Sequence, residues 1–598
     1  MDGLVWNLAT WDGLLTWGPV ARVVLVVMLM CWDFPLLVPC YLMHRGFWGR
    51  HPWRTADYAR PLSTLVVIPS LLRKPDELAS MMSTVESIAG NGYPGQLLIV
   101  LTIDGTTDAP DLYKKLQQWA TTRSWLHRYS LRVTGTPSRR SKPMAIDHAM
   151  EYVKGLVASG EIDSFPPVYI STDADADLGT GAIEAIVLRL QKRNPWTGWP
   201  ARIVAGALHV RGNAFWQGWR KYFSIAGQLN LQVAREYYVG NVWRHNIRWL
   251  PITGVPGAFY CAWSEIFLAI PSFMGYMQTL HLRHWLRWWF GIAPPRFSES
   301  TAAPIPDLMA GDTDDTVTAY ASILARFENG RFTLDPPRTP LHAIYYLVRS
   351  IFWDRAIHYE PRAKVFTSSP TTIKALFRQR KRWNCSRIEL TGRYWPALCY
   401  HWQLGLPVLV VKALLANSVV LGALAYFWLP IVLPGTRYWT GFLIGYTAAV
   451  VASTITTTLT LVMNGELYNW RMLLAVPFVP FYIFGINWMP AFVGSTADVL
   501  LFGNITGFSP ETTLKRGGSV RIALAFRVRR ALLLAVRSVV VGDVPLGWFW
   551  LGWRETTWTP SGYEGWTTGE RPRSIVPPLS QWFSSRRGST TDSRTDVA

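Results

Sequence analysis

The positions of the long apolar runs limit the possible folds of this chain more than any other feature of its sequence. One run covers residues 20–42, and two more cover residues 404–433 and 439–463, on either side of a short polar turn. Each run is long enough for a membrane span, which needs roughly 20 apolar residues. No stretch within residues 55–400 is apolar enough to span. The pattern therefore predicts a large folded region held between membrane segments.

The charges that flank the first run predict its orientation. Asp2 and Asp12 precede the run, whereas five basic or histidine residues follow it, at positions 44, 45, 50, 51 and 54. Positive charge accumulates on the cytoplasmic side of a membrane, so residues 55–400 are expected in the cytoplasm and the protein in the inner or plasma membrane. A cleaved signal peptide fits poorly, because the run is too long and lacks a preceding basic region.

The chain after residue 464 divides into three predicted parts. The run at residues 472–501 contains three prolines, which favours broken or re-entrant helices over one straight span. Residues 519–560 begin with five arginines among apolar residues and are expected to form an amphipathic helix in the interface, since so many charges are too costly at bilayer depth. Residues 561–598 are rich in Ser, Thr, Arg and Pro and are expected to be disordered. The predicted units are thus 1–50, 55–400, 401–518, 519–560 and 561–598.

The composition agrees with a membrane protein that carries a folded domain. Charged residues make up 16% of the chain, against roughly 25% in ordinary soluble domains, and 32 residues are Trp, which suits a membrane interface. The net charge of 59 − 39 = +20 is compatible with nucleic acid, anionic lipid or a polyanionic substrate. The five cysteines form no CxxC pair, so zinc and redox motifs are not favoured.

The central region shows the alternation typical of an α/β fold. Apolar strand patterns occupy residues 65–69, 97–103 and 168–171, and a helical stretch covers residues 76–90. Strands that alternate with helices predict a mostly parallel sheet with both faces covered. Ligands bind beyond the carboxyl ends of such strands, where this chain has acidic residues.

The acidic residues after the third strand, Asp173 and Asp175, form a DAD sequence. Because side chains alternate, two carboxylates two residues apart point the same way, and they can share a divalent cation with phosphate oxygens. An Asp-rich turn that caps the next helix is the alternative explanation. Asp177 leaves open which pair would bind the metal.

Two later clusters of charged residues also suggest catalytic or binding roles. The sequence GDTDD at residues 311–315 crowds three carboxylates, whose repulsion should raise the pKa of at least one of them, as a general base requires. A solvated acidic loop is the commoner explanation. The basic sequence QRKRW at residues 379–383 could bind phosphates, nucleic acid or lipid headgroups, and taken alone it favours an interfacial helix.

The order of these parts resembles a known family. IDGTTD at residues 103–108 is followed by SKPMAIDHA, DAD, GDTDD, QRKRW and paired apolar runs. This order is similar to that of the processive family 2 glycosyltransferases, such as hyaluronan, cellulose and chitin synthases and the nodulation chito-oligosaccharide synthase. The resemblance covers residues 60–518. It implies a cytoplasmic GT-A-like glycosyltransferase domain embedded between transmembrane and interfacial helices.

On the donor side, the resemblance implies a UDP-sugar and a divalent cation. Asp104 would contact the uracil or ribose, and Lys142 would lie beside the nucleotide, although the glycine that usually precedes this lysine is absent. Asp173 and Asp175 would hold Mg²⁺ or Mn²⁺ on the diphosphate. The metal would neutralise the charge that develops on the departing UDP.

On the acceptor side, the resemblance implies that Asp315 is the base that deprotonates the acceptor hydroxyl. The family motif has three residues where this chain has GDTDD, so Asp314 and Asp312 remain alternatives. The QxxRW motif would bind phosphate oxygens and the terminal acceptor sugar. Its residues here are Gln379, Arg382 and Trp383.

Three further segments are compared with the family. Gly257 lies in a loop similar to the acceptor loop of the relatives, and Lys515 and Arg516 fall where relatives carry a gating loop with diphosphate contacts. Residues 331–362 look like an insertion, which is expected to form an amphipathic helix at the membrane.

The expected function is transfer of sugar from a UDP-sugar to a growing polysaccharide or oligosaccharide, with inversion to a β-linked product and secretion through the membrane. The alternative is a non-processive enzyme with a lipid acceptor. A basic membrane protein without enzymatic activity is disfavoured, because the acidic clusters would have no purpose there. Membrane lipid is an expected partner and nucleic acid is not. Because the spans are few, a partner subunit or an oligomer could complete a channel.

Overall fold

The structure is a computed structural model. It describes a series of segments within residues 60–482. They are residues 60–127, 129–139, 141–194, 197–211, 219–246, 255–279, 314–334, 357–380, 436–464 and 467–482, together with Trp383, Leu390 and Tyr394.

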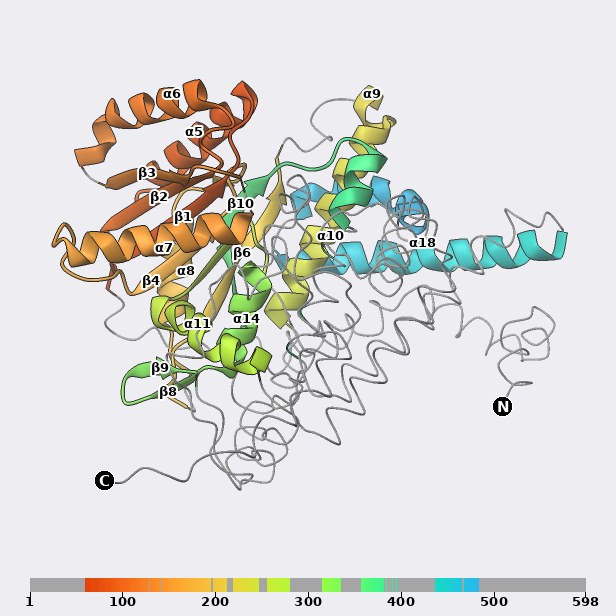
Figure 1. The fold of residues 1–598 in the computed structure, drawn as a ribbon. Coiled ribbons are helices and arrows are strands. Elements are labelled where there is room, and N and C mark those ends of the chain that lie inside the picture. Colours follow the sequence, from red (N-terminus) through yellow and green to blue (C-terminus); the bar gives the residue numbers. More distant parts are fainter. Residues whose placement is uncertain are drawn as a thin grey trace, which may run out of the picture.

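An eight-stranded sheet organises the described region (Figure 1). Its strands in chain order are β1 (Thr64–Ser70), β2 (Leu97–Asp104), β3 (Ser130–Thr136), β4 (Val168–Thr172), β5 (Asp177–Leu178), β6 (Ile203–Val210), β7 (Phe259–Trp263) and β10 (Ile357–Thr367). Their spatial order is β3-β2-β1-β4-β7-β6-β10-β5. β7 runs antiparallel to both of its neighbours, and β5 runs antiparallel to β10. The remaining strands share one direction, so the mostly parallel sheet predicted from the sequence is confirmed.

The strands are apolar on both sides because both faces of the sheet are covered. In β1, Leu65 and Val67 belong to one hydrophobic cluster, and Val66 and Ile68 belong to the other. All four side chains are fully buried. A continuous apolar run, rather than an alternating one, is what a doubly covered parallel strand requires.

Helices on the two faces complete these clusters. The helix α7 (Lys142–Ala158) packs on the face that holds Leu65, whereas α5 (Pro75–Ala89) and α6 (Pro110–Thr121) pack on the opposite face (Figure 1). The remaining helices that contact the sheet or its flanks are η2 (Ser124–His127), α8 (Ala182–Gln191), α10 (Ile225–Asn246), α11 (Ser264–Thr279) and α14 (Asp314–Leu324). Pro residues begin α5 and α6, at the position where a missing N–H costs nothing.

The elements expected from the sequence around the first strands are confirmed. The strand expected at residues 65–69 is β1, the helix expected at 76–90 is α5, and the strands expected at 97–103 and 168–171 are β2 and β4. The strands β3, β5, β6, β7 and β10 were not predicted. In particular, nothing in the local sequence of β7 indicates that it runs against its neighbours.

The interpretation of residues 331–362 as an insertion with an amphipathic helix is wrong at both ends of that segment. Its start is β9 (Arg331–Thr333), which forms a hairpin with β8 (Arg326–Glu328). Its end, residues 357–362, is the first half of β10, which lies inside the main sheet. The register of β10 shifts between Glu360 and Lys364, around Pro361, because a proline cannot donate a ladder hydrogen bond. This break conceals the strand pattern.

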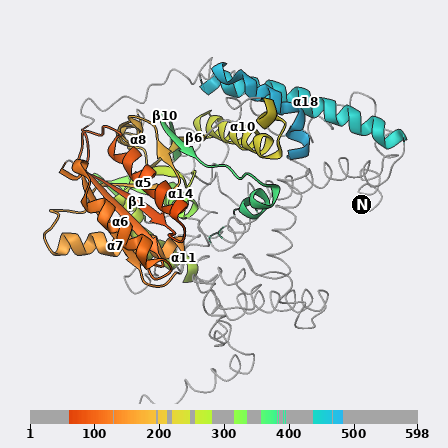
Figure 2. The same ribbon diagram turned by 90° about the horizontal axis from the view of Figure 1, so that it is seen from above.

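A second layer lies beside α10 (Figure 2). It contains α18 (Thr436–Asn464) and the 3₁₀ helix η5 (Leu467–Phe478), while the short α9 (Trp219–Tyr222) precedes α10. Arg235 of α10 donates from Nε to the Thr457 hydroxyl of α18 at 2.8 Å, and both residues are buried. Gln232 of α10 donates to the Ala475 carbonyl in η5 at 2.7 Å.

Among the described helices, none combines the length and the apolar character that a membrane crossing requires. The span expected at residues 439–463 falls within α18 and is not confirmed. The spans expected at 20–42 and 404–433 lie outside the described residues, as do most of the 472–501 run, the interfacial helix and the tail.

Candidate active site

The carboxyl edge of the parallel strands collects polar side chains from segments that are far apart in the sequence. Asp104 ends β2, Thr136 ends β3, and Asp173 follows β4. Because β7 runs the opposite way, it begins at this edge and brings Gly257 and Ala258 there. The Ala258 carbonyl accepts hydrogen bonds from the Thr172 hydroxyl and the Asp173 N–H. The sequence-based expectation that the acidic residues lie at this edge agrees with this arrangement.

Asp104 lies buried beneath the turn that follows β2. Its carboxylate accepts a hydrogen bond from the Thr136 hydroxyl at 3.3 Å. Gly105 has a φ of 87°, and a Cβ at this position would come within 2.8 Å of the Arg139 Cβ. Only glycine therefore permits this tight turn over the strand end.

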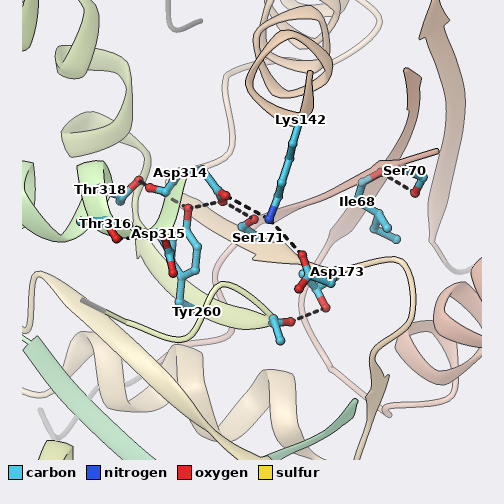
Figure 3. A network of polar contacts seen from close by, with 12 residues as sticks. Ile68, Ser70, Lys142, Ser171, Asp173, Tyr260, Asp314, Asp315, Thr316 and Thr318 are labelled. Carbon is cyan, nitrogen blue, oxygen red and sulfur yellow. Dashed lines mark hydrogen bonds and ion pairs between the residues drawn. The ribbon is translucent and has the colours of Figure 1, made fainter. Parts of the chain in front are cut away.

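Lys142 is the centre of the site (Figure 3). It is the first residue of α7, whose N-cap Ser141 accepts a hydrogen bond from the Met144 N–H. The Lys142 ammonium lies 2.9 Å from Asp173 Oδ1 and 2.9 Å from Asp314 Oδ1. This lysine was predicted to lie beside the nucleotide, but in the structure its charge is shared between two carboxylates of the protein.

Asp314 is fully buried at the first position of α14. Its Oδ2 accepts hydrogen bonds from the Ser171 hydroxyl and the Tyr260 hydroxyl, both at 3.0 Å, while its Oδ1 makes the ion pair with Lys142 (Figure 3). Burial, and next the charge of Asp314, raises the pKa of Tyr260 well above its ordinary value, so this phenol keeps its proton and acts as a donor. An anion that is buried and paired in this way is held in a fixed position.

Asp173 follows β4 at the carboxyl edge, and 38% of its side chain is exposed. Desolvation by the surrounding protein raises the pKa of this carboxyl. Lys142 opposes that shift, and the neighbouring charge of Asp175 adds to it. The exposed part of Asp173 is the part that a ligand can reach.

Asp175 and Asp177 have different partners. Ser368, which follows β10, donates to Asp175 Oδ2 at 2.5 Å. Arg211, which follows β6, contacts the Asp175 carbonyl at 3.3 Å and forms an ion pair with Asp177 at 2.5 Å. Asp177 also accepts from Ser83 of α5 at 3.0 Å, so it acts as a structural anchor and leaves Asp173 and Asp175 as the candidate metal pair.

Ser368 and Arg211 were not predicted from the sequence. Neither residue lies in a motif. They reach the site because β6 and β10 run parallel to β4 and end at the same edge. Only the sheet order could have identified them.

The donor atoms at Asp173 and Asp175 suit a hard divalent cation. Within the described segments, no cluster of three or more His, Cys, Asp or Glu side chains could hold a metal by itself. Mg²⁺ is usually held by one or two carboxylates plus substrate phosphates, and it keeps several waters. Two carboxylates at the opening of the edge fit that mode of binding.

Asp315 differs from its neighbour Asp314 because it is only partly buried. Its Oδ1 accepts hydrogen bonds from the N–H and the hydroxyl of Thr316, at 2.6 and 3.1 Å. A Cβ added to Gly257 would lie 3.2 Å from Asp315 Oδ2, so the glycine allows the β7 loop to approach this carboxylate closely. The structure thus brings two of the predicted residues, Gly257 and Asp315, side by side.

The QRKRW segment contributes a second cationic cluster next to α10. Arg380 is buried, and its guanidinium forms an ion pair with Glu236 of α10 at 2.8 Å. Its Cζ lies 4.4 Å from the centre of the Trp383 ring, in a cation–π contact. The Tyr482 hydroxyl donates to Glu236 at 2.8 Å. Arg380 was predicted only as part of the basic run expected in an interfacial helix, whereas in the structure it is buried and paired with Glu236.

The other predicted residues are placed as follows. Gln379 is partly buried, and its Oε1 has no hydrogen-bond partner among the described residues. Four residues with predicted roles lie outside the described segments, and these are Asp312, Arg382, Lys515 and Arg516.

Comparison with known proteins finds similarity to a number of solved structures. No family model matches the sequence, and no curated protein matches it. The structure resembles the mannosyltransferase PcManGT from Pyrobaculum calidifontis in complex with GDP-mannose and Mn²⁺. The two chains are 13% identical, the match covers 73% of this chain and 98% of the other, and the TM-score is 0.33. A TM-score below 0.5 does not establish a common fold, so the assignment of function depends on the geometry of the site.

Proposed function

We propose that this chain is a metal-dependent glycosyltransferase that transfers a sugar from a UDP-sugar to a growing polysaccharide, with inversion at the anomeric carbon. The observation that carries the proposal is the convergence of Asp104, Lys142, Asp173, Asp175 and Asp315 around the carboxyl edge of one sheet. These residues come from four segments of the chain, namely the end of β2, the start of α7, the turn after β4 and the start of α14. Ligands of open α/β sheets bind at this edge.

In this proposal the donor lies along the ends of β2 and β4. Asp104 faces the nucleoside, and Asp173 and Asp175 hold Mg²⁺ or Mn²⁺ at the diphosphate. The bound metal supplies Lewis-acid stabilisation of the departing nucleoside diphosphate. The hydrogen bond between Ser368 and Asp175 supports this role, because it orients the carboxylate from the far side of the site.

Asp315 takes the proton from the acceptor hydroxyl. The reaction needs a carboxylate on the acceptor side that the acceptor can reach. Asp314 does not meet this requirement, because it is fully buried and its carboxylate is held by Lys142, Ser171 and Tyr260. Asp315 is partly exposed beside the Gly257 loop, which supports its assignment as the base.

The acceptor chain approaches from the side of Trp383. An aromatic face suits the C–H face of a pyranose, and Arg380 stacks against this ring at 4.4 Å and holds it in place. The QxxRW motif supports processive elongation. The apolar runs at residues 20–42 and 404–433 support attachment to the cell membrane and secretion of the product.

The experiment that tests this function measures UDP release. Purified full-length protein is incubated with Mn²⁺ and one UDP-sugar at a time, with GDP-mannose as a comparison donor. We expect turnover with a UDP-sugar and none after chelation of the metal. A product that grows to a long polymer on a gel supports processivity, whereas a single glycosylated lipid would favour the lipid-acceptor alternative. Absence of release with every nucleotide sugar would contradict the proposal.

A further inference from the structure

The ammonium of Lys142 forms ion pairs with two carboxylates, one on the donor side and one on the acceptor side of the proposed reaction. Asp173 lies on the donor side, after β4, and Asp314 begins α14, the helix whose second residue is the proposed base Asp315. The Lys142 ammonium is 2.9 Å from an oxygen of each (Figure 3). Its side chain is only 15% exposed.

The two carboxylates depend on Lys142 to different degrees. Asp314 is fully buried, and the other described partners of its carboxylate, Ser171 and Tyr260, are neutral donors. A buried anion needs a compensating charge, which Lys142 supplies. Asp173 is 38% exposed, so water and an incoming cation can stabilise its charge in place of the lysine.

The metal site and the lysine therefore compete for the same carboxylate. Lys142 contacts Oδ1 of Asp173, a residue that would also bind the divalent cation. Two positive charges beside one carboxylate repel each other. The ammonium is a compact charge on a flexible stem, and it can move towards Asp314 while it stays paired.

We propose that Lys142 is a shared internal counter-ion that couples occupancy of the donor site to the position of α14. When the donor and its metal are bound, Lys142 gives up its contact with Asp173 and pairs fully with Asp314. The start of α14 is then held more tightly, and Asp315 is fixed beside the Gly257 loop. The inference rests on the proposed function and adds a positioning role for Lys142 and Asp314.

The first test measures Mn²⁺ affinity by calorimetry in the presence of UDP, without turnover. Removal of the competing charge in Lys142→Met should tighten Mn²⁺ binding roughly 10-fold. Lys154→Met is the matched control, because Lys154 lies on the same helix in an exposed ion pair with Glu151, and it should leave the affinity unchanged. Unchanged or weaker binding in Lys142→Met would overturn the inference.

The second test follows α14 by hydrogen exchange and does not depend on the stability of the single variant. In the natural protein, UDP and Mn²⁺ should slow exchange in residues 314–324. The double variant Lys142→Met/Asp314→Asn leaves no lone buried charge, so we expect it to fold and to bind Mn²⁺ while the response of α14 disappears. A response of natural size in the double variant would overturn the inference.

Asp173→Asn separates failure of the inference from failure of the proposed function. If the natural protein binds Mn²⁺ and Asp173→Asn does not, the metal site stands, and the variants of Lys142 decide the coupling. If Asp173→Asn binds Mn²⁺ as the natural protein does, the metal assignment is wrong and the coupling fails with it.

Discussion

Two cations, the partly buried Lys142 and the buried Arg380, lie in two different polar clusters of this molecule. Lys142 bridges two carboxylates at the carboxyl edge of the sheet. Among the described residues, Arg380 has one carboxylate partner, Glu236, and its guanidinium stacks on Trp383. Lysine carries a compact charge that can move between partners, whereas arginine offers a planar group that fixes both a carboxylate and a ring. In the proposed enzyme, this difference predicts a donor side that changes its ion pairs and an acceptor side that stays rigid.

The largest expected effect separates Asp315 from Asp314. Asp315→Asn should reduce sugar transfer by about 10²–10⁴-fold, because the acceptor hydroxyl loses its base, while UDP-sugar binding stays nearly intact. Steady-state transfer rates and calorimetric binding of UDP-sugar measure the two quantities.

Asp314→Asn should act on stability instead. Loss of one partner of a buried ion pair costs about 3–5 kcal/mol, which thermal unfolding would detect. If Asp314→Asn is inactive but as stable as the natural protein while Asp315→Asn transfers sugar normally, Asp314 is the base and the assignment is wrong by one residue.

The next largest effect concerns the metal pair. Asp175→Asn should weaken Mn²⁺ binding, because an amide cannot replace an anionic ligand on a hard cation. The loss should be at least roughly 10–100-fold, which is the cost of removing a group that only supports a metal ligand. Calorimetry with UDP present gives the affinity. Asp177→Asn is the comparison variant, because Asp177 is already paired with Arg211 and Ser83. Equal losses in both variants would contradict the choice of Asp173 and Asp175 as ligands.

A smaller effect is expected at the acceptor cluster. Trp383→Ala should raise the KM for the acceptor several-fold, in line with about 0.5–1.5 kcal/mol for an aromatic stacking contact, and leave the donor KM unchanged. Arg380→Lys should raise the acceptor KM in the same direction, because a lysine cannot keep both the ion pair and the stacked contact. Arg123→Lys is the matched control, since Arg123 stacks on Trp119 of α6 outside the site. A change in donor KM as large as that in acceptor KM would indicate a structural tryptophan.

The smallest effect is a pH dependence of stability that comes from α7. Burial lowers the pKa of His148, whose Nε2 lies 2.9 Å from the Thr134 hydroxyl. Above the ordinary pKa of His, both the folded and the unfolded form are neutral, and the contribution is fully present. As the pH falls below that value, the unfolded state takes up the proton first, so stability decreases until the folded pKa is passed. His148→Gln should therefore lose less stability than the natural protein between pH 7.5 and 5.5 in thermal unfolding, and an equal loss would exclude this histidine as the source.

The interpretation of the sequence succeeded where a local pattern has only one structural solution. The apolar runs in β1, β2 and β4 are too short for spans and lie between turn residues, so they predict buried strands. It failed at β10, where Pro361 and a register shift break the pattern, and at β7, whose direction depends on pairing with distant strands. The expected span at residues 439–463 lies in α18, which carries buried threonines, and Arg235 of α10 donates to one of them, Thr457.

The candidate site shows the same division between local and non-local information. Asp173, Asp175 and the pair Asp314 and Asp315 were selected from the sequence because they follow an apolar strand or crowd one short segment, and their roles were predicted from the resemblance to a known family. The residues that act on them, Ser368, Arg211 and Tyr260, carry no local signal. They lie at the site only because distant strands end at one edge.

The sequence by itself determined the residue types at the carboxyl edge and the strands that present them, since both follow from short-range patterns of hydrophobicity and charge. The tertiary structure alone decided which charges meet. It placed Lys142 between Asp173 and Asp314. Asp173 lies 173 − 142 = 31 positions after the lysine in the sequence, and Asp314 lies 314 − 142 = 172 positions after it. It also buried Asp314 while leaving Asp315 accessible. Burial and charge pairing depend on every element packed around a group, and no window of the sequence contains all of those elements.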